Sequence, residues 1–124
     1  MPPAGSTAGG CIPFGEVIMS GVLVYITCKD KAEAEKVGQA LVEAKLAACV
    51  NIIDGMQSMF WWEGAAQKES ETVLLAKTKV GLVQKLTDKV KSVHSYDCPC
   101  VVAVPIIDGN PEFLQWIQEE TTQP

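Results

Sequence analysis

Apolar runs along the chain alternate with segments whose apolar residues recur at helical spacing. Residues 22–27 are β-branched, aromatic or aliphatic at consecutive positions, which predicts a central strand that is apolar on both faces. Asp30 and Glu33 then form a capping-box pattern, in which the aspartate accepts from early backbone N–H groups and the glutamate reaches back. The helical spacing that follows predicts a helix that ends near Leu46.

The middle of the chain has the pattern of a hairpin. Residues 49–62 predict a long strand that bends at Asp54-Gly55, where a glycine after an acidic residue favours a turn or bulge. After a predicted loop over residues 63–66, residues 71–78 predict a second strand, and Thr78 is a candidate cap for the next helix. Three consecutive aromatic residues end the first strand, so at least one large ring must leave the domain's own core.

The last third of the chain predicts two more helices and one more strand. Residues 80–92 have a helical apolar stripe, and residues 101–104 form a short apolar strand whose following Pro105 suits a sheet edge. Asn110-Pro111 is a cap followed by a first helical position, which predicts a short final helix. The order strand, helix, strand, strand, helix, strand predicts an α+β, ferredoxin-like βαββαβ subunit with a short C-terminal helix.

One domain is predicted over residues 21–120. The chain has 124 residues, which suffices for one core and is too short for two domains of ordinary size. Residues 1–20 are rich in glycine and proline without a helical or strand period, so we expect a disordered tail there. We expect residues 121–124 to fray.

The predicted strands also bear on assembly. Helices cover only one face of the sheet in a ferredoxin-like subunit, yet the strands are apolar on both sides and 48% of the chain is hydrophobic. Covering apolar surface contributes about 25 cal/mol for each Å², so several hundred Å² would favour association by several kcal/mol. The pattern therefore predicts a homo-oligomer.

Charge and cysteine content narrow the choice of partners and compartment. A formal net charge of −5 argues against nucleic acid as a partner, and no run approaches the roughly 20 apolar residues of a membrane span. Five cysteines is an odd number in irregular spacing, and Cys28 and Cys49 lie inside apolar segments, which favours a reducing compartment. No basic targeting signal precedes Lys29, so a cytoplasmic location is expected, although a leader missing from this sequence or another isoform would change it.

Residues 94–100, His-Ser-Tyr-Asp-Cys-Pro-Cys, concentrate the candidate chemistry, including the only histidine. His94, Asp97 and Cys98 are candidate metal ligands of types that suit copper or zinc. The alternative is a structural His94 near a helix C-terminus, because no paired CxxC or HxxxH element supports a strong metal pattern. No nucleophile has an evident base and orienting group, so no catalytic residue is assigned and a non-enzymatic protein is predicted.

Several local patterns resemble the CutA family, the so-called divalent cation tolerance proteins, in the form found in animals. They occur in the family's order and approximate spacing and together cover roughly residues 22–119. The matching segments are Lys45–Ile52, Ser58–Gly64, Leu74–Thr78, His94-x-Tyr96-Asp97-x-Pro99 and Phe113–Ile117. The family's usual His-Pro-Tyr-Glu-x-Pro-Glu has here lost its first proline, shortened one carboxylate and replaced the last glutamate by Cys100.

The resemblance implies a tight homotrimer with its sheets turned inward, similar in outline to PII signal proteins. It implies a role in copper or other divalent cation binding and tolerance, with no metal essential for folding. Two functions remain open: a trimeric protein that binds metal or, like PII proteins, a small ligand, and a trimeric scaffold that acts through a protein partner. For animal members the second reading implies acetylcholinesterase maturation or anchoring.

Four further residues are candidates for an intersubunit pocket that would bind a small anion or a metal–ligand complex. They are Trp61, Lys77, Tyr96 and Trp116. The alternative is that these aromatic residues only pack at a subunit interface.

Overall fold

The computed structural model describes residues 20–124 and confirms the predicted fold class. Four strands form one sheet in the order β2-β3-β1-β4, and every neighbouring pair is antiparallel. This is the ferredoxin-like βαββαβ arrangement followed by one more helix. The disordered tail predicted for residues 1–20 lies, apart from its last residue, outside the described residues. The elements are β1 (Gly21–Cys28), α2 (Lys31–Glu43), β2 (Cys49–Trp62), β3 (Ala65–Lys79), the 3-10 turn η1 (Val80–Leu82), α3 (Val83–Val93), β4 (Val101–Pro105) and α4 (Pro111–Glu120).

Two of the three predicted helix caps are confirmed. The Asp30 carboxylate accepts from the Glu33 N–H at 2.8 Å at the start of α2, and the Asn110 side chain accepts from the Glu112 N–H at 3.1 Å at the start of α4. The third prediction is wrong, because Thr78 is a fully buried residue of β3 and the turn η1 begins after Lys79 without a side-chain cap. The strand continues past the position where the pattern suggested that it ended.

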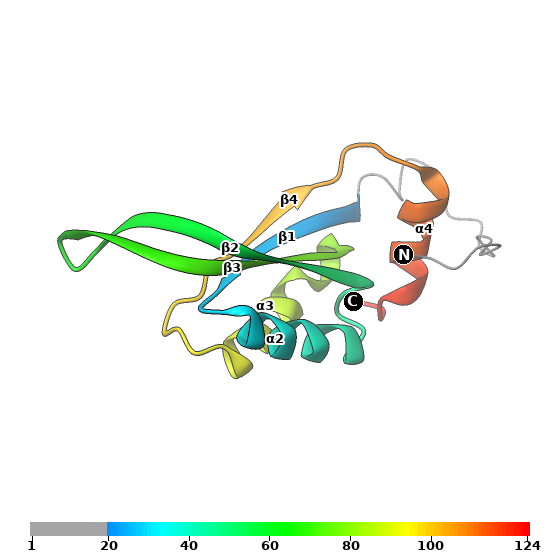
Figure 1. Cartoon of the computed structure of the whole chain (residues 1–124). Helices are drawn as coiled ribbons and strands as arrows, with labels where there is room; N and C mark the ends of the chain where they lie inside the picture. Colours follow the sequence, from blue (N-terminus) through cyan, green and yellow to red (C-terminus); the bar gives the residue numbers. More distant parts are fainter. Residues whose placement is uncertain (1–19) are drawn as a thin grey trace.

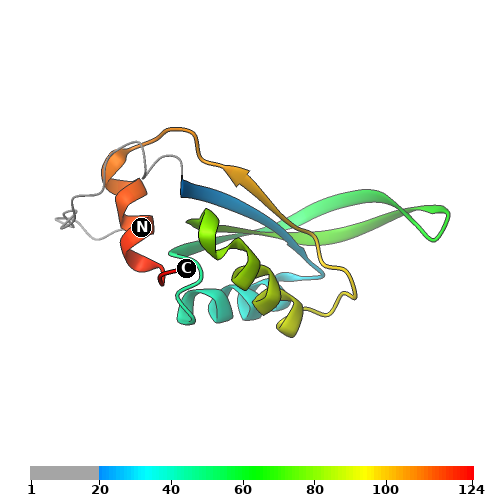
Figure 2. The same ribbon diagram turned by 180° about the vertical axis from the view of Figure 1, so that it is seen from behind.

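Helices α2 and α3 lie on the same face of the sheet, as both ribbon views show (Figures 1 and 2). The main core lies between them and the sheet. Its fully buried side chains come from alternate residues of β1 and β3 and from the facing stripes of the two helices. They include Val24, Ile26, Leu74, Leu41 and Leu86.

Strands β2 and β3 extend beyond β1 and β4 as a two-stranded arm (Figure 1). The loop predicted over residues 63–66 is wrong, because the turn consists of Glu63 and Gly64 alone and β3 begins at Ala65. Both turn residues have positive φ angles, 50° and 79°, as a tight hairpin turn of the primed type requires.

The predicted bend in β2 is confirmed at Asp54-Gly55. The pairing of β2 with β3 shifts register between Ile53 and Met56, and Gly55 has a φ of 79° that favours glycine. The Asp54 carboxylate accepts from the Gly55 N–H at 2.9 Å and from the Thr72 hydroxyl at 2.8 Å. These bonds hold the bulge and also hold the pKa of Asp54 below its usual value.

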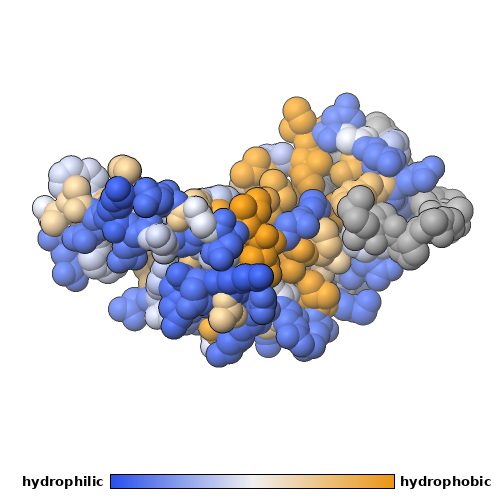
Figure 3. All heavy atoms as spheres, in the orientation of Figure 1, coloured by the Kyte–Doolittle hydropathy of each residue, from blue (hydrophilic) through white to orange (hydrophobic). Residues whose placement is uncertain are grey.

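The second face of the sheet, which we call the open face, has the predicted apolar side chains at its centre. The β1 residues Leu23 and Tyr25 are paired with Val104 and Val102 of β4, and both valines are about half exposed. Figure 3 shows apolar side chains gathered over the central part of the molecule, between the arm and α4. Helix α4 covers only one end of this face.

The contacts of α4 fix it against the end of β3. The buried Lys79 ammonium donates to the backbone carbonyls of Gln118 at 3.2 Å and Thr121 at 3.4 Å. The Thr122 N–H also donates to the Lys45 carbonyl at 2.9 Å, and Pro124 lies against Gly81. Residues 121–124 thus contact the domain in the structure, while their predicted fraying concerns motion and stays a prediction.

Candidate functional site

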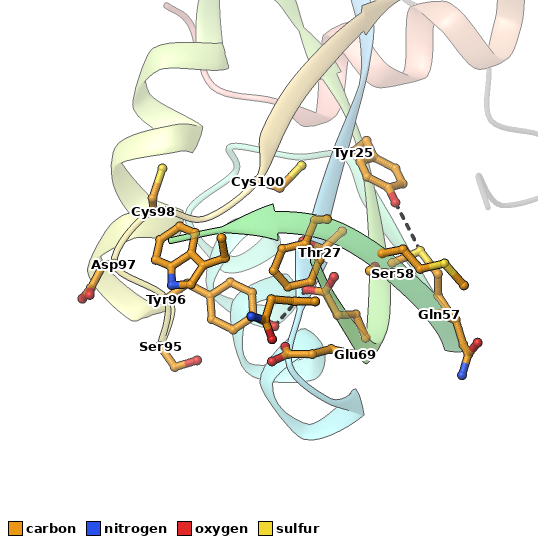
Figure 4. Close-up of a pocket in the computed structure, with 16 residues that line it drawn as sticks. Tyr25, Thr27, Gln57, Ser58, Glu69, Ser95, Tyr96, Asp97, Cys98 and Cys100 are labelled. Atoms are coloured by element: carbon orange, nitrogen blue, oxygen red, sulfur yellow. Dashed lines mark hydrogen bonds between the residues drawn. The ribbon is translucent and has the colours of Figure 1, made fainter. Parts of the chain in front are cut away.

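A hollow of about 930 Å³ lies on the open face between residues 94–100 and the arm (Figure 4). Three parts of the chain form its walls: the end of β1, the arm, and the connection from α3 to β4. Its lining is both polar and sulfur-rich. The residues most relevant to chemistry are Tyr25, Met56, Met59, Glu69, Glu71, Tyr96, Asp97, Cys98 and Cys100.

His94 lies behind this hollow, and its side chain is fully buried. Its Nδ1 accepts from the Tyr96 N–H at 3.0 Å, and its Nε2 lies 2.7 Å from the carbonyl oxygen of Thr27. Because Nδ1 accepts, the ring proton belongs on Nε2, which donates to Thr27. The imidazole therefore uses both nitrogens to attach the connection to β1.

Glu33 joins the start of α2 to the same connection. Its Oε1 accepts from the Lys29 N–H at 3.0 Å, and its Oε2 accepts from the Ser95 N–H at 3.0 Å. Burial raises the pKa of Glu33, but the hydrogen bonds from Ser95 and Lys29 and the nearby His94 outweigh burial and hold this pKa below its usual value. The carboxylate is thus ionised at neutral pH and acts as both a helix cap and a tertiary anchor.

Within residues 20–124, three metal-ligand types come together only at Cys28, Glu33 and His94, whose ligand atoms lie within 4.8 Å of one another. A thiol, a carboxylate and an imidazole suit zinc or copper by type. Here, however, both carboxylate oxygens and both ring nitrogens already have backbone partners. Burial, together with Glu33 and other acidic groups, raises the pKa of the Cys28 thiol to about 12. The cluster therefore fits a closed hydrogen-bonded core rather than a resident metal.

The structure separates the three predicted metal ligands. Asp97 and Cys98 are exposed and line the hollow (Figure 4). The His94 side chain is instead buried against β1. A metal held by all three would require His94 to give up one of its two hydrogen bonds.

The wall of the hollow also contains a partly buried tyrosine–carboxylate pair. The Tyr96 hydroxyl donates to Glu71 at 2.9 Å, and its ring lies 4.6 Å from the ring of His94. Burial and the bond to Glu71 raise the pKa of Tyr96, and burial, Glu71 and Cys98 raise the pKa of the Cys100 thiol. The carboxylates here favour a cation over an anion.

The four pocket candidates do not all lie together in one subunit. Tyr96 lines the hollow, and Trp61 is 77% exposed on the arm. Lys77 donates to Asn51 and lies 5.9 Å from the ring centre of Phe113, whose ring packs on that of Trp116 at the α4 end. One subunit therefore does not form a pocket from all four.

Sequence reasoning missed Glu33, Cys28 and Met56 as neighbours of residues 94–100. The capping pattern identified Glu33 only as a local helix cap, although its bond to Ser95 spans 62 positions of the chain. No local signal marked Cys28 or Met56, because an apolar strand position looks the same with or without a neighbouring site.

Fold and site together define a small ferredoxin-like protein with a protruding arm and an acidic, sulfur-lined hollow beside the arm. Residues 22–120 match the family model described as CutA1 divalent ion tolerance protein, and the chain belongs to this family. It is 36% identical to Protein CutA 1, chloroplastic, of Oryza sativa and 38% identical to Protein CutA of Homo sapiens, over 95% and 96% of the chain. It is 45% identical to the divalent-cation tolerance protein CutA of Archaeoglobus fulgidus, over 77% of the chain and 93% of that relative.

Solved structures of relatives have the same fold. The crystal structure of CutA1 from Oryza sativa has a TM-score of 0.83 at 38% identity and covers 87% of this chain and 99% of that one. CutA1 from Thermus thermophilus has a TM-score of 0.81 at 41% identity, with 82% and 99% covered. The chain spans 67%, 55% and 64% of the rice, Arabidopsis thaliana and human relatives. No helix in residues 20–124 is long and apolar enough to cross a membrane.

Proposed function

We propose that this chain is a non-enzymatic, divalent-cation-binding protein of the CutA type, with copper as the first candidate ion. The observation that carries this proposal is the hollow beside the arm, which is lined by acidic side chains and by thiols. Carboxylates and thiols are the ligand types that divalent transition metals take in proteins. The relatives named divalent-cation tolerance proteins support the same class of role.

The proposed ligands are Asp97 and Cys98, which are exposed and lie on one short segment. His94, the third predicted ligand, does not bind the ion in this proposal. Its two hydrogen bonds instead fix the backbone path of the segment that carries Asp97 and Cys98. The buried cluster around Cys28 is not the proposed site, because the ligand atoms of Glu33 and His94 already bond to backbone groups.

We further propose that the protein works as a homotrimer. The open face supports this assembly, since its half-exposed valines would be costly to leave in water. In the trimer, the candidate intersubunit pocket would take Trp61, Lys77, Tyr96 and Trp116 from neighbouring subunits. Within one subunit, Lys77 and Trp116 both lie beside Phe113, whereas Tyr96 lines the hollow and Trp61 is exposed on the arm.

Isothermal titration of Cu(II) and Zn(II) tests the proposal. We expect the double variant Asp97→Asn, Cys98→Ser to bind at least tenfold more weakly than the wild type. The matched control Asp88→Asn, Cys49→Ser changes the same residue types outside the hollow and should bind as the wild type does. Absence of binding by the wild type, or equal binding by the double variant, would overturn the proposal.

A second candidate function is a trimeric scaffold for a protein partner, and the exposed arm favours it. Met59, Trp61 and Trp62 are 74%, 77% and 52% exposed near its tip, and large aromatic side chains are typical interface anchors. Acetylcholinesterase is the partner implied for animal members. Purified acetylcholinesterase should then bind the wild type in the presence of EDTA and should bind Trp61→Ala, Trp62→Ala at least tenfold more weakly; equal binding would remove this candidate.

A cytoplasmic location is part of the proposal. All four cysteines within residues 20–124 are free, which suits a reducing compartment. Fractionation of cells that express the natural protein would test it, and recovery in an organelle fraction would contradict it.

A further inference from the structure

We propose that Cys49 and Lys77 form an acyl-transfer pair, in which the thiol takes an acyl group from a thioester and passes it to the lysine amine. Lys77 is then a site of self-acylation on the open face, and neither residue lines the hollow. The inference goes beyond the proposed function and needs no metal ion.

The pairing of β2 with β3 places the two side chains opposite each other. Cys49 and Lys77 are Cα partners in this ladder, and opposite side chains of an antiparallel pair lie close together on one face. Lys77 also pairs with Leu23 of β1, so both side chains lie on the open face. The Ala48 N–H donates to the Lys77 carbonyl at 2.9 Å and extends the pairing beyond β2. The strand register therefore holds the thiol beside the amine.

The lysine nitrogen contacts the thiol directly. Lys77 Nζ donates to Cys49 Sγ at 3.5 Å, and within residues 20–124 no other lysine donates to a thiol. A second bond to Asn51 Oδ1 and the Phe113 ring, whose centre is 5.9 Å away, hold the ammonium at this position. Cys49 is a free thiol, and both side chains are partly exposed, so neither is enclosed within the subunit.

The first step moves the acyl group to sulfur. The Cys49 thiolate attacks the carbonyl carbon of the thioester and forms a new carbon–sulfur bond, while the original carbon–sulfur bond breaks and the donor leaves as a thiolate. The Lys77 ammonium stabilises the negative charge on the attacking sulfur, as cationic neighbours do at reactive cysteines. The contact between the two side chains thus favours the first step.

The second step moves the acyl group to nitrogen. The neutral Lys77 amine attacks the same carbonyl carbon, forms an amide bond and expels the Cys49 thiolate. Because the nitrogen lies 3.5 Å from the sulfur, it is close to any carbon bonded to that sulfur, so the step gains from proximity. Overall, one ammonium and one thioester give one amide, one free thiol and one proton. Cys49 is regenerated and Lys77 is consumed, so each chain reacts once without turnover.

Acylation changes the charge where α4 covers the open face. An acylated lysine has no positive charge, so the cation–aromatic contact with Phe113 is lost. The Phe113 ring also packs on Trp116 of the same helix, at 5.5 Å between ring centres. The state of Lys77 therefore acts on the contacts between α4 and the sheet.

Incubation of the full chain with acetyl-CoA in the presence of EDTA, followed by peptide mass spectrometry, tests the inference. We expect Lys77 to be acetylated at least tenfold faster than Lys85, which is exposed on α3. Cys49→Ser should slow acetylation of Lys77 at least tenfold and leave that of Lys85 unchanged. Cys98→Ser, which removes an exposed thiol to which no described lysine donates, is the matched control and should acetylate Lys77 at the wild-type rate.

Lys77→Arg gives the second readout. Arginine keeps a positive charge beside the sulfur but stays protonated and cannot take the acyl group, so a hydroxylamine-sensitive acetyl group should accumulate on Cys49. Equal acetylation of Lys77 in the wild type and in Cys49→Ser would overturn the inference, as would the absence of this acetyl group in Lys77→Arg. Circular dichroism and solution mass of each variant confirm that it keeps the fold and assembly.

The presence of EDTA separates this inference from the proposed function. Acetylation is measured without divalent ions, so its result does not depend on whether the hollow binds one. Conversely, titration of the metal ions contains no thioester, so a failure there leaves this inference standing.

Discussion

Thr72 and Thr78 form a natural pair for comparison at the scale of single residues. Both are fully buried on the helix-facing side of β3, yet their hydroxyl groups have different surroundings. The Thr72 hydroxyl donates to Asp54 at 2.8 Å, whereas the Thr78 hydroxyl has no hydrogen-bond partner within residues 20–124. An unsatisfied buried hydroxyl costs free energy that a methyl group of the same shape would not.

Thr78→Val should therefore raise the free energy of unfolding by about 1 kcal/mol. Thr72→Val is the matched control and should lower it by about 1 kcal/mol, because Asp54 then loses a donor that holds the bulge. Urea denaturation at one fixed protein concentration measures both. A Thr78→Val protein less stable than the wild type would show that the hydroxyl has a partner after all.

At the scale of elements, the connection between α3 and β4 depends on the start of α2. Glu33 is the anchor, since it holds the Ser95 N–H and lies 3.6 Å from the imidazole of His94. The pKa of Glu33 is lower in the folded protein than its usual value of 4.5. Its contribution to stability is then complete above the unfolded-state pKa and is lost as the pH falls through the folded-state pKa.

Glu33→Gln should be less stable than the wild type by about 1–3 kcal/mol at pH 7. Between about pH 5 and pH 3, the wild type should lose stability faster than the variant, so that the two unfolding curves converge. Denaturation at a series of pH values measures this difference. A gap that stays constant down to pH 3 would mean that the carboxylate charge contributes nothing.

Helix α4 depends in the same way on one buried lysine of β3. Lys79→Met keeps the length of the side chain but removes the two bonds to the carbonyls of Gln118 and Thr121. Amide hydrogens of residues 112–120 should exchange about tenfold faster, which corresponds to about 1.4 kcal/mol of opening free energy. Lys85→Met, at an exposed position of α3, should leave these exchange rates unchanged.

At the scale of the whole molecule, the open face determines assembly. Val102 and Val80 are exposed to similar extents, 51% and 58%, but only Val102 lies on the open face. The wild type should show a mass three times that of the 13.3 kDa chain. Val102→Glu should shift this mass toward the monomer because it would bury an unpaired charge, and Val80→Glu should not.

Light scattering over a range of micromolar concentrations measures these masses. A monomeric wild type would contradict the trimer directly. A Val102→Glu protein that stays trimeric would mean that the subunits meet through another surface.

Short-range patterns in the sequence predicted the order of the elements, because each element depends mainly on its own residues. They also predicted the helix caps Asp30 and Asn110 and the bend at Gly55. Residues 65–70 could not be assigned to a strand, since two alanines and four polar residues give no apolar strand pattern, and they gain their strand form from pairing with β2. The surroundings of the site could not be predicted either. Bonds such as Glu33 to Ser95 and Tyr25 to Met56 join segments that only the folded sheet brings together.

His94 offers a simple way to follow the molecule by NMR. The chain has a single histidine, so one pair of imidazole signals in a nitrogen–proton NMR spectrum belongs to it without further assignment. Since Nδ1 and Nε2 bond to different segments, Tyr96 and Thr27, the two signals report separately on the connection and on β1. One spectrum before and after adding an ion would show whether binding in the hollow reaches the core.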